Sequence, residues 1–360
     1  MLRIVFALAC VFCLANPTAA SAWGFQGHRV VGSIADKLLT PNAAAQVKEI
    51  LNPPGSRDPS PGTHEFDLRK AGPWADCVRS VARLPDGTFK YTPNDLHPEY
   101  ELPCIPFRDE RGAMEDYASR NWTTCPYPSG CHTSFHFDDV ALQRGGFDRT
   151  YQGTNEHDVV AAVTAAIAVL SGKPVPPPVP PSTFAFSIKD KREALLLLTH
   201  FVGDLHQPLH VGSVYLDTDG KLVDPDLAHH IDPATETIGG NAIQDQNINL
   251  HAEWDDIPTD LGDATTRELT AAAKLVPAST GPIEDWPVAW AGDTVLVARN
   301  AFAGLTFTFQ PPQPPETTKP QWLVTFEDHT AYLWMMDQIK RRQLAKGGAR
   351  LAQILNTLWP

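Results

Sequence analysis

Residues 199–210 read THFVGDLHQPLH and directly follow four leucines at positions 195–198. His200 and Asp204 are four residues apart, so on a helix their side chains lie on one face. The proline of this stretch is expected to kink or end the helix, which would turn His210 toward the same neighbourhood. A buried imidazole or carboxylate needs a partner or a ligand when leucines surround it. The stretch therefore predicts a polar site inside an apolar helix.

The same four-residue spacing recurs in LHAEWD, where His251 precedes Asp255. Imidazole and carboxylate groups are common zinc ligands. One such pair alone is more often a surface pair or a capped histidine, because neighbours at this spacing interact on any helix. Two pairs, one of them in an apolar helix, favour a site for more than one metal ion. His206 stands among these ligands, and we expect it to orient a carboxylate.

Helical periodicity dominates the rest of the chain. Apolar residues recur at helical spacing between residues 30 and 51, and further helices are expected over residues 157–170, 189–205 and, as one or two helices, 321–358. Runs that alternate between apolar and polar residues, which would predict strands, are scarce. The sequence predicts a mainly α fold, one helical domain over residues 23–360 with long irregular loops.

The composition limits the kinds of protein this chain can be. Its 360 residues carry 29 Lys+Arg and 42 Asp+Glu, a formal net charge of −13. This balance argues against a protein that coats nucleic acid with a broad basic surface. It is compatible with an enzyme that meets phosphate at one local positive site.

Residues 1–22 have the features of a secretory signal peptide. Arg3 provides the positive start, residues 4–14 form a short apolar run, and the small residues at 20–22 fit a cleavage site. A buried N-terminal helix or a membrane anchor is the alternative. We expect a secreted or periplasmic protein with no membrane span after residue 22.

Cleavage at this site would make Trp23 the first residue, five positions before His28. An α-amine has a pKa of about 8, so a metal ion readily displaces its proton. The amine and the carbonyl of one residue can then bind a single ion.

Four cysteines would remain after cleavage, Cys77, Cys104, Cys125 and Cys131. An even number in an oxidising compartment favours disulfides, and three pairings are possible. The short loop between Cys125 and Cys131 favours that pair, which leaves Cys77 for Cys104. Free buried thiols are the alternative. A four-cysteine zinc site is disfavoured because no C-x-x-C pair is present.

Two other segments place polar groups beside aromatic residues. Asp76 lies in WADCVR, three residues before Arg79, and His136 lies in SFHFDD. Taken together and in this order, the motifs resemble the zinc-dependent single-strand-specific nucleases of the S-one/P-one type. The resemblance runs from WGFQGH at residues 23–28 to the last expected helix and includes GGN at 239–241. It implies a helical fold with three zinc ions at the bottom of a cleft.

The family pattern also implies which residues hold these ions. One ion would be bound by Asp76, His136, His200 and Asp204, a second by the amine and carbonyl of Trp23, by His28 and by Asp204 as a bridge, and the third by His210, His251 and Asp255. Zinc lowers the pKa of water toward neutrality. The resemblance therefore implies hydrolysis of phosphodiesters by a zinc-activated water, with 5′-phosphate products.

By the same match, Asp139 would orient the attacking water and Arg79 would hold the phosphate. Phe137 would stack on a base and Asn241 would contact the nucleotide, which favours unpaired DNA or RNA as substrate. Three alternatives stay open: Phe137 as a core residue, Arg79 as a surface helix residue, and Asp138 in place of Asp139.

Two other functions compete with a nuclease. Zinc phospholipases C share the implied architecture, but their third site usually ends in Glu, where this chain has Asp255. A non-enzymatic, zinc-stabilised exported binding protein is the second alternative. The sequence implies a monomer without a stable protein partner. Base preference and 3′-nucleotidase activity are left open.

Overall fold

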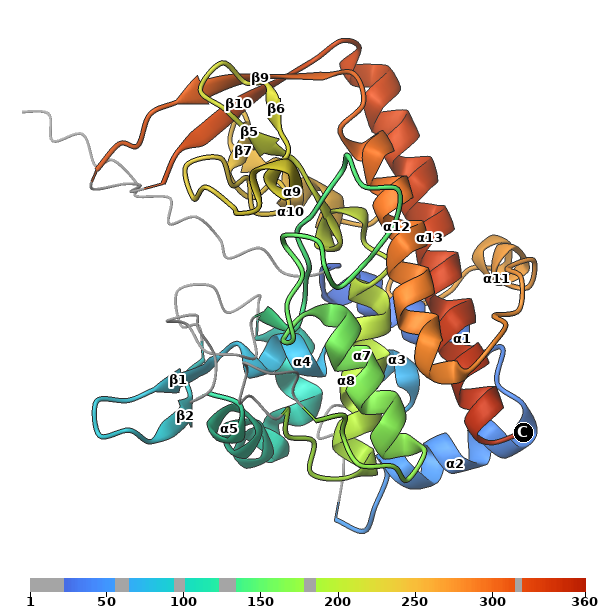
Figure 1. Cartoon of the computed structure of the whole chain (residues 1–360). Helices are drawn as coiled ribbons and strands as arrows, with labels where there is room; N and C mark the ends of the chain where they lie inside the picture. The colour runs from blue at the N-terminus through green and yellow to red at the C-terminus, as the bar shows by residue number, and fades with distance from the viewer. Residues whose placement is uncertain (1–22, 56–64, 94–100, 123–133, 178–185, 315–318) are drawn as a thin grey trace, which may run out of the picture.

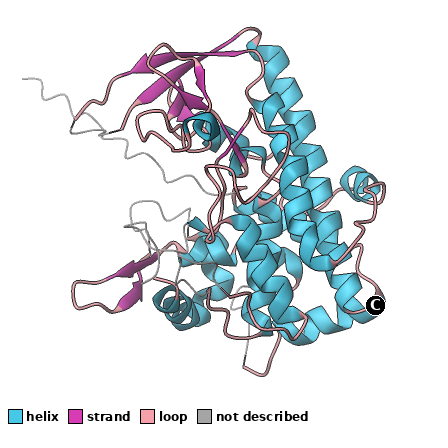
Figure 2. Ribbon diagram, viewed as in Figure 1, coloured by secondary structure: helices cyan, strands magenta, loops and turns pink. Residues whose placement is uncertain are grey.

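The computed structural model describes residues 23–55, 65–93, 101–122, 134–177, 186–314 and 319–360 (Figure 1). The fold is mainly α, as the sequence predicts, and Figure 2 shows strands only in small groups around the helices. The helices are α1 (Phe25–Asp36), α2 (Pro41–Leu51), α3 (Leu68–Ala71), α4 (Trp74–Val78), α5 (Arg111–Arg120), α7 (Val159–Leu170), α8 (Lys191–Asp204), α9 (Pro225–Ala228), α10 (Leu250–Asp255), α11 (Arg267–Ala273), α12 (Trp286–Ala301) and α13 (His329–Leu358). Short 3-10 helices are η2 (Leu102–Glu110), η3 (Pro208–His210) and η4 (Ile283–Asp285).

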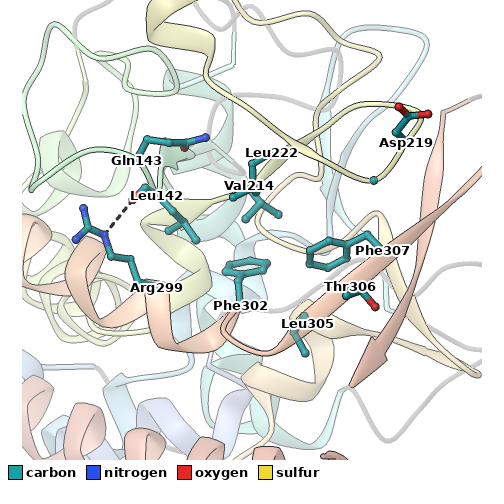
Figure 3. Close-up of a pocket in the computed structure, with 11 residues that line it drawn as sticks. Leu142, Gln143, Val214, Asp219, Leu222, Arg299, Phe302, Leu305, Thr306 and Phe307 are labelled. Carbon is teal, nitrogen blue, oxygen red and sulfur yellow. Dashed lines mark hydrogen bonds between the residues drawn. The ribbon is translucent and has the colours of Figure 1, made fainter. Parts of the chain in front are cut away.

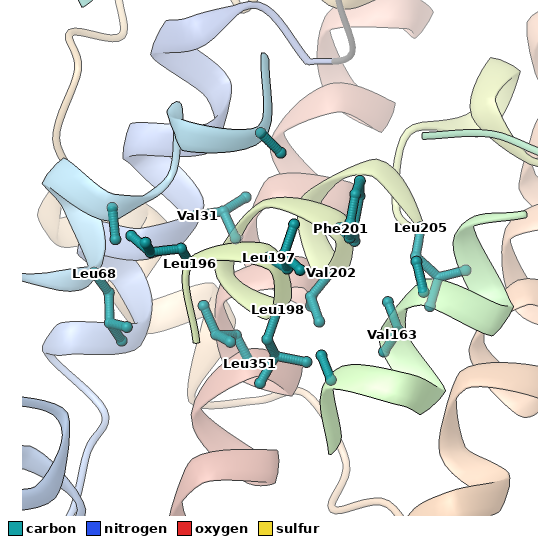
Figure 4. Close-up of a cluster of buried hydrophobic side chains, with 14 of the residues drawn as sticks. Val31, Leu68, Val163, Leu196, Leu197, Leu198, Phe201, Val202, Leu205 and Leu351 are labelled. Atoms are coloured by element: carbon teal, nitrogen blue, oxygen red, sulfur yellow. The ribbon is translucent and has the colours of Figure 1, made fainter. Parts of the chain in front are cut away.

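Helix α8 lies at the centre of the larger hydrophobic core. It begins after Asp190, whose side chain accepts a hydrogen bond from the backbone N–H of Glu193. Its leucines pack among side chains of α1, α3, α7 and α13, which Figure 4 shows as Val31, Leu68, Val163 and Leu351. The helix ends at Asp204, and Pro208 begins η3 instead of kinking α8. The end of α8 is therefore held firmly inside the protein.

The long helix α13 runs beside α1 (Figure 1), and its Lys346 and Arg350 form ion pairs with Asp293 of α12. Glycine allows the close approach of α1 and α13, because a Cβ at Gly348 would lie 2.4 Å from the Cβ of Ile34. None of the described helices is both long and apolar enough to cross a membrane.

The strands correct one expectation from the sequence. Residues 321–326 form β10 and not the start of a helix, and α13 begins only at His329. Strand β10 pairs antiparallel with β9 and parallel with β7, in a four-stranded sheet of order β8-β7-β10-β9. The strands are β1 (Val81–Arg83), β2 (Phe89–Tyr91), β3 (Val140–Ala141), β4 (Gly212–Ser213), β5 (Tyr215–Leu216), β6 (Leu222–Val223), β7 (Ile243–Asp245), β8 (Ile248–Asn249), β9 (Leu305–Gln310) and β10 (Gln321–Phe326).

A second core cluster lies beneath this sheet. It includes Trp322 of β10, Trp254 of α10 and Tyr332 of α13, and Leu209 of η3 belongs to it. Leu205, at the end of α8, belongs to the first cluster. The segment between these leucines therefore crosses from one core to the other and is buried throughout.

The Cys77–Cys104 disulfide is present, with an S–S distance of 2.00 Å. It ties α4 to η2. The expected Cys125–Cys131 pair lies outside the described residues.

Candidate metal centre

The end of α8 presents His200 and Asp204 one turn apart, both with no solvent exposure. Nδ1 of His200 donates a hydrogen bond to the backbone oxygen of Gly72 at 2.7 Å. This bond fixes the ring and leaves Nε2 facing Asp204, 3.2 Å from its Oδ2. Nδ1 of His136 lies 3.0 Å from the same oxygen and 3.1 Å from Nε2 of His200. Three donor atoms from two distant segments therefore meet at one point.

Helix α1 adds His28 to this group. Nε2 of His28 lies 3.3 Å from Oδ1 of Asp204, and its ring stacks on that of His200 with centroids 3.6 Å apart. Gly203 makes room for this ring, because a Cβ there would lie 2.8 Å from Nδ1 of His28. Asp76, from α4, completes the cluster with Oδ1 at 3.9 Å from Nε2 of His200.

Trp23 is fully buried beside these residues. A Cβ at Gly203 would lie 3.8 Å from Cδ1 of its indole, and the N–H of Gly24 donates to the backbone oxygen of Asp255 at 2.9 Å. The start of α1 thus lies close to both predicted ligand groups. Binding of a metal by the amine of Trp23 stays a prediction.

A third group lies on the far side of Asp204. Nε2 of His210 is 3.1 Å from Nε2 of His251 and 3.6 Å from Oδ1 of Asp255. Nδ1 of His210 donates to the backbone oxygen of His136, and Nδ1 of His251 donates to the backbone oxygen of Gly239, each at 2.7 Å. Backbone carbonyls therefore hold both rings with Nε2 turned toward Asp255.

The donor atoms fit a set of metal ions. In the described part of the chain, three groups place ligand atoms within 4.8 Å of one another: His28 with Asp76 and His200, His136 with His200 and Asp204, and His210 with His251 and Asp255. The groups contain the predicted side-chain ligands, although His28 is grouped with Asp76 and His200, which the family pattern assigns to another ion. Several of their buried atoms have no hydrogen-bond partner, namely both carboxylate oxygens of Asp76, Oδ1 of Asp204, Oδ2 of Asp255 and both ring nitrogens of His28.

Burial controls the charge of these ligands. It lowers the pKa of each ligand histidine, so that the rings are neutral and keep a lone pair for a metal. Burial raises the pKa of Asp76 and of Asp255 to about 6, and that of Asp204 well above its ordinary value. Three buried carboxylates without a cation are unfavourable. A divalent cation would replace their protons and fill the unpartnered positions.

Three of the predicted ligands line a cavity of ≈ 210 Å³. His136, His210 and His251 line its bottom together with Leu209 and Gly239. Its wall consists of half-exposed residues: Arg79, Phe137, Asp139, Ile238 and Asn241. All four predicted catalytic and substrate residues thus lie in one wall above the ligands.

Asp139, and not Asp138, faces this cavity. The backbone N–H of Asp139 donates to the backbone oxygen of Gly153, and its backbone oxygen accepts from the hydroxyl of Tyr215 at 2.7 Å. Although the residue is partly exposed, Oδ1 of its carboxylate is buried, and this burial together with the nearby Glu236 raises the pKa of Asp139 to about 7. Asp138 points away into the protein, where burial and the adjacent Asp158 raise its pKa well above the ordinary value.

Arg79 and Phe137 are also placed at the cavity. Nη1 of Arg79 lies 3.6 Å from Oδ1 of Asp76, and its side chain is 23% exposed. Phe137 packs against neither core cluster. Both side chains therefore line the cavity, and contact of either with a substrate stays a prediction.

Comparison with known proteins identifies the family of this chain. Residues 23–360 match the model of the S1/P1 nuclease family, the S-one/P-one type that the motifs resemble. The chain belongs to the S1/P1 nuclease family. It is 24% identical over 384 residues to Endonuclease 2 of Arabidopsis thaliana, covering 99% of this chain and 98% of that protein. It is 27% identical over 193 residues to Endonuclease 3 of the same plant, covering 46% of this chain and 51% of that protein.

Family and relatives support a nuclease, a hydrolase acting on ester bonds of nucleic acid, over a phospholipase or a binding protein. In this S1/P1 nuclease, sequence reasoning missed Gln207. Its Nε2 donates to Oδ1 of Asp255 at 2.7 Å, and its Oε1 accepts from the N–H of Leu209. The expected role of His206 is wrong, because its ring contacts the backbone oxygen of Val202 and Nη1 of Arg350 and no carboxylate.

An exposed histidine pair and a second cavity of this S1/P1 nuclease lie outside the centre. The His229-His230 pair is exposed, and His132 is not among the described residues. A larger cavity of ≈ 490 Å³ is shown in Figure 3, with Phe302, Phe307 and Arg299 in its lining. None of the predicted site residues lines it.

Proposed function

We propose that this protein is an exported, zinc-dependent endonuclease that cleaves single-stranded DNA and RNA to products with 5′-phosphates. Residues 1–22 would be removed as a signal peptide, and the domain of residues 23–360 would bind three Zn²⁺ ions. The single observation that carries the proposal is the convergence of buried histidines and unpartnered carboxylate oxygens at a cavity that the predicted catalytic and substrate residues also line.

Zinc fits the donor set better than other common ions. Each group combines neutral imidazole nitrogen with carboxylate oxygen, a mixture typical of zinc, whereas magnesium and calcium prefer oxygen alone. Asp204 would serve two ions, since its two oxygens face different histidines. When bound, zinc supplies Lewis acidity, which acidifies water and offsets phosphate charge.

The residues of the wall would perform the rest of the reaction. Arg79 would hold a phosphate oxygen and the charge that grows on it in the transition state. Asp139 would orient the water and accept its proton, which its raised pKa favours near neutral pH. Phe137 would stack on a base.

Single strands suit this cavity because stacking requires an unpaired base and tolerates any base type. The acidic chain supplies little non-specific attraction, so binding would depend on the few groups at the site. Such an enzyme would hold a few nucleotides at a time and would disfavour a rigid duplex.

The test compares a single-stranded oligonucleotide, the same sequence as a duplex, and phosphatidylcholine, each with protein that begins at Trp23. We expect rapid cleavage of the single strand, slow cleavage of the duplex and no lipid hydrolysis. A chelator should abolish cleavage and Zn²⁺ should restore it, while the products should carry 5′-phosphates. Lipid hydrolysis without DNA cleavage would overturn the proposal, as would a protein that loses only thermal stability on zinc removal and never cleaves a phosphodiester.

A further inference from the structure

The β9–β10 hairpin brings a lysine to the cavity of the metal centre. Strand β10 runs parallel to β7, with Trp322 beside Ile243, so both strands begin at the same edge of the sheet. Asn241, which lines the cavity, lies two residues before Ile243, and Lys319 lies three residues before Trp322. The pairing of the strands therefore places Lys319 next to the cavity wall.

Two carboxylates at this place respond to the charge of Lys319. Burial and Glu236 raise the pKa of Asp139, which lines the cavity, and the positive charge of Lys319 opposes this shift. Burial also raises the pKa of Glu236, and Lys319 again acts in the opposite direction. Charges act on one another in this way only at short range, because salt screens them beyond about 10 Å. The electrostatics thus agree with the strand pairing on the position of the ammonium group.

The backbone at Lys319 is held firmly. Pro320 follows it and restricts Lys319 to extended conformations. Trp322 is fully buried, and its Nε1 donates to the backbone oxygen of Asp217 at 3.1 Å. Lys319 itself is exposed, and its long side chain is flexible. Such a side chain can exchange a carboxylate for a phosphate at little cost, because ion pairs at a protein surface contribute little to stability.

We propose that Lys319 binds the phosphate next to the scissile one on a bound single strand. This inference rests on the proposed function, which assigns the scissile phosphate to Arg79. Arg79 follows α4, and Figure 1 shows α4 in the lower half of the view and the hairpin in the upper half. Lys319 would therefore meet the strand where it leaves the cavity. In a chain with a net charge of −13, a local cation of this kind attracts a polyanion where the rest of the surface does not.

The test uses a thymidine hexamer and a second hexamer in which uncharged methylphosphonates replace every phosphate except the central one. For Lys319→Gln, we expect KM for the charged hexamer to rise about 3–10-fold, because one phosphate contact is lost. KM for the methylphosphonate hexamer should not change. Turnover on both should stay within about twofold, since the contact is equal in the ground and transition states.

The salt dependence of KM provides a second readout. Each phosphate contact with a single strand adds about 0.7 to the slope of log affinity against log salt concentration. The slope for the charged hexamer should therefore be smaller by about 0.7 in Lys319→Gln than in the wild type. The slope for the methylphosphonate hexamer should be the same in both proteins.

Two further variants serve as controls. Lys173→Gln removes an exposed lysine that pairs with Glu284 and does not line the cavity, and it should leave both KM values unchanged. Lys319→Arg keeps the positive charge and should retain the wild-type KM within about twofold. Lys319→Gln should melt at the wild-type temperature, because a substitution at an exposed residue changes stability little.

The proposal is overturned if Lys319→Gln cleaves the charged hexamer with the wild-type KM and salt slope, or if it raises KM equally for both hexamers. A fall in turnover on both hexamers with a shifted pH profile also overturns it, because that result shows that Lys319 acts through the charge of Asp139. If the wild-type protein cleaves neither hexamer, the proposed function fails. Binding of a fluorescent charged hexamer then decides: weaker binding by Lys319→Gln supports the role of Lys319, and unchanged binding overturns it.

Discussion

Nε2 of His28 lies 3.3 Å from Oδ1 of Asp204 and joins the first helix to the buried end of α8. The other oxygen of the same carboxylate lies 3.0 Å from Nδ1 of His136. One buried carboxylate thus faces histidines from two sides. Its two oxygens are in position to serve two metal ions at once.

Asp204→Asn should therefore lose two of the three zinc ions and not one. The neutral amide keeps the shape of the side chain but cannot supply two anionic oxygens. Elemental analysis of the purified variant measures the loss. Asp138→Asn is the matched control, because Asp138 is equally buried but belongs to no ligand group, and it should retain the full zinc content. Loss of a single zinc from Asp204→Asn would indicate that the sites are separate.

Gln207→Ala should weaken binding of the third zinc ion. Without the amide, Asp255 loses the hydrogen bond that fixes its Oδ1, and partners of this kind change metal affinity by about 10–100-fold. Competition with a chelator measures the affinity. Gln207→Glu keeps an acceptor for the N–H of Leu209 but cannot donate to Asp255, so it should weaken zinc binding too. Wild-type affinity in both variants would show that Gln207 only stabilises the turn.

One extra residue before Trp23 should reduce activity at least about 100-fold, because it removes the α-amine that the resemblance assigns to a zinc ion. Tagged protein that retains the extra residue is compared with protein processed to Trp23. Thermal unfolding of the two forms serves as a control for folding. Equal activity would remove the amine from the ligand set.

Asp36 should make the stability of the protein depend on pH. Burial, with a smaller effect from Asp67, raises its pKa to about 7. The folded protein then keeps a proton that the unfolded chain loses near pH 4. The contribution of this protonated carboxyl to the free energy of unfolding is therefore fully present below about pH 4 and is lost as the pH rises through about 7. The loss amounts to at most about 4 kcal/mol. Asp36→Asn should gain stability relative to wild type over this range.

Urea unfolding at several pH values between 5 and 8 measures this difference. The backbone N–H groups of Leu68 and Arg69 donate to the two oxygens of Asp36, and an amide can accept only one of them. That loss adds an offset that does not vary with pH. A difference between wild type and variant that stays constant across the range would contradict the raised pKa.

The sequence predicts the helical core and most of the site because their signals are local. The leucines before His200 define a buried helix, and the four-residue spacings place His200 with Asp204 and His251 with Asp255. The resemblance adds Asp76, His136 and His28, which no spacing could bring together. The structure places all of these side chains at one centre.

What the sequence does not predict depends on distant partners. The composition of β10 is compatible with a helix or a strand. Its pairing with β7 joins residues about 80 positions apart. Gln207 reads as an ordinary polar loop residue until Asp255, 48 positions later, folds against it.

The zinc content of protein that begins at Trp23 tests the central claim most directly. Three grouped sets of buried ligands predict three zinc ions per chain, measured by elemental analysis after removal of loosely bound metal. A chain that cleaves single-stranded DNA with one zinc ion or none would contradict the account.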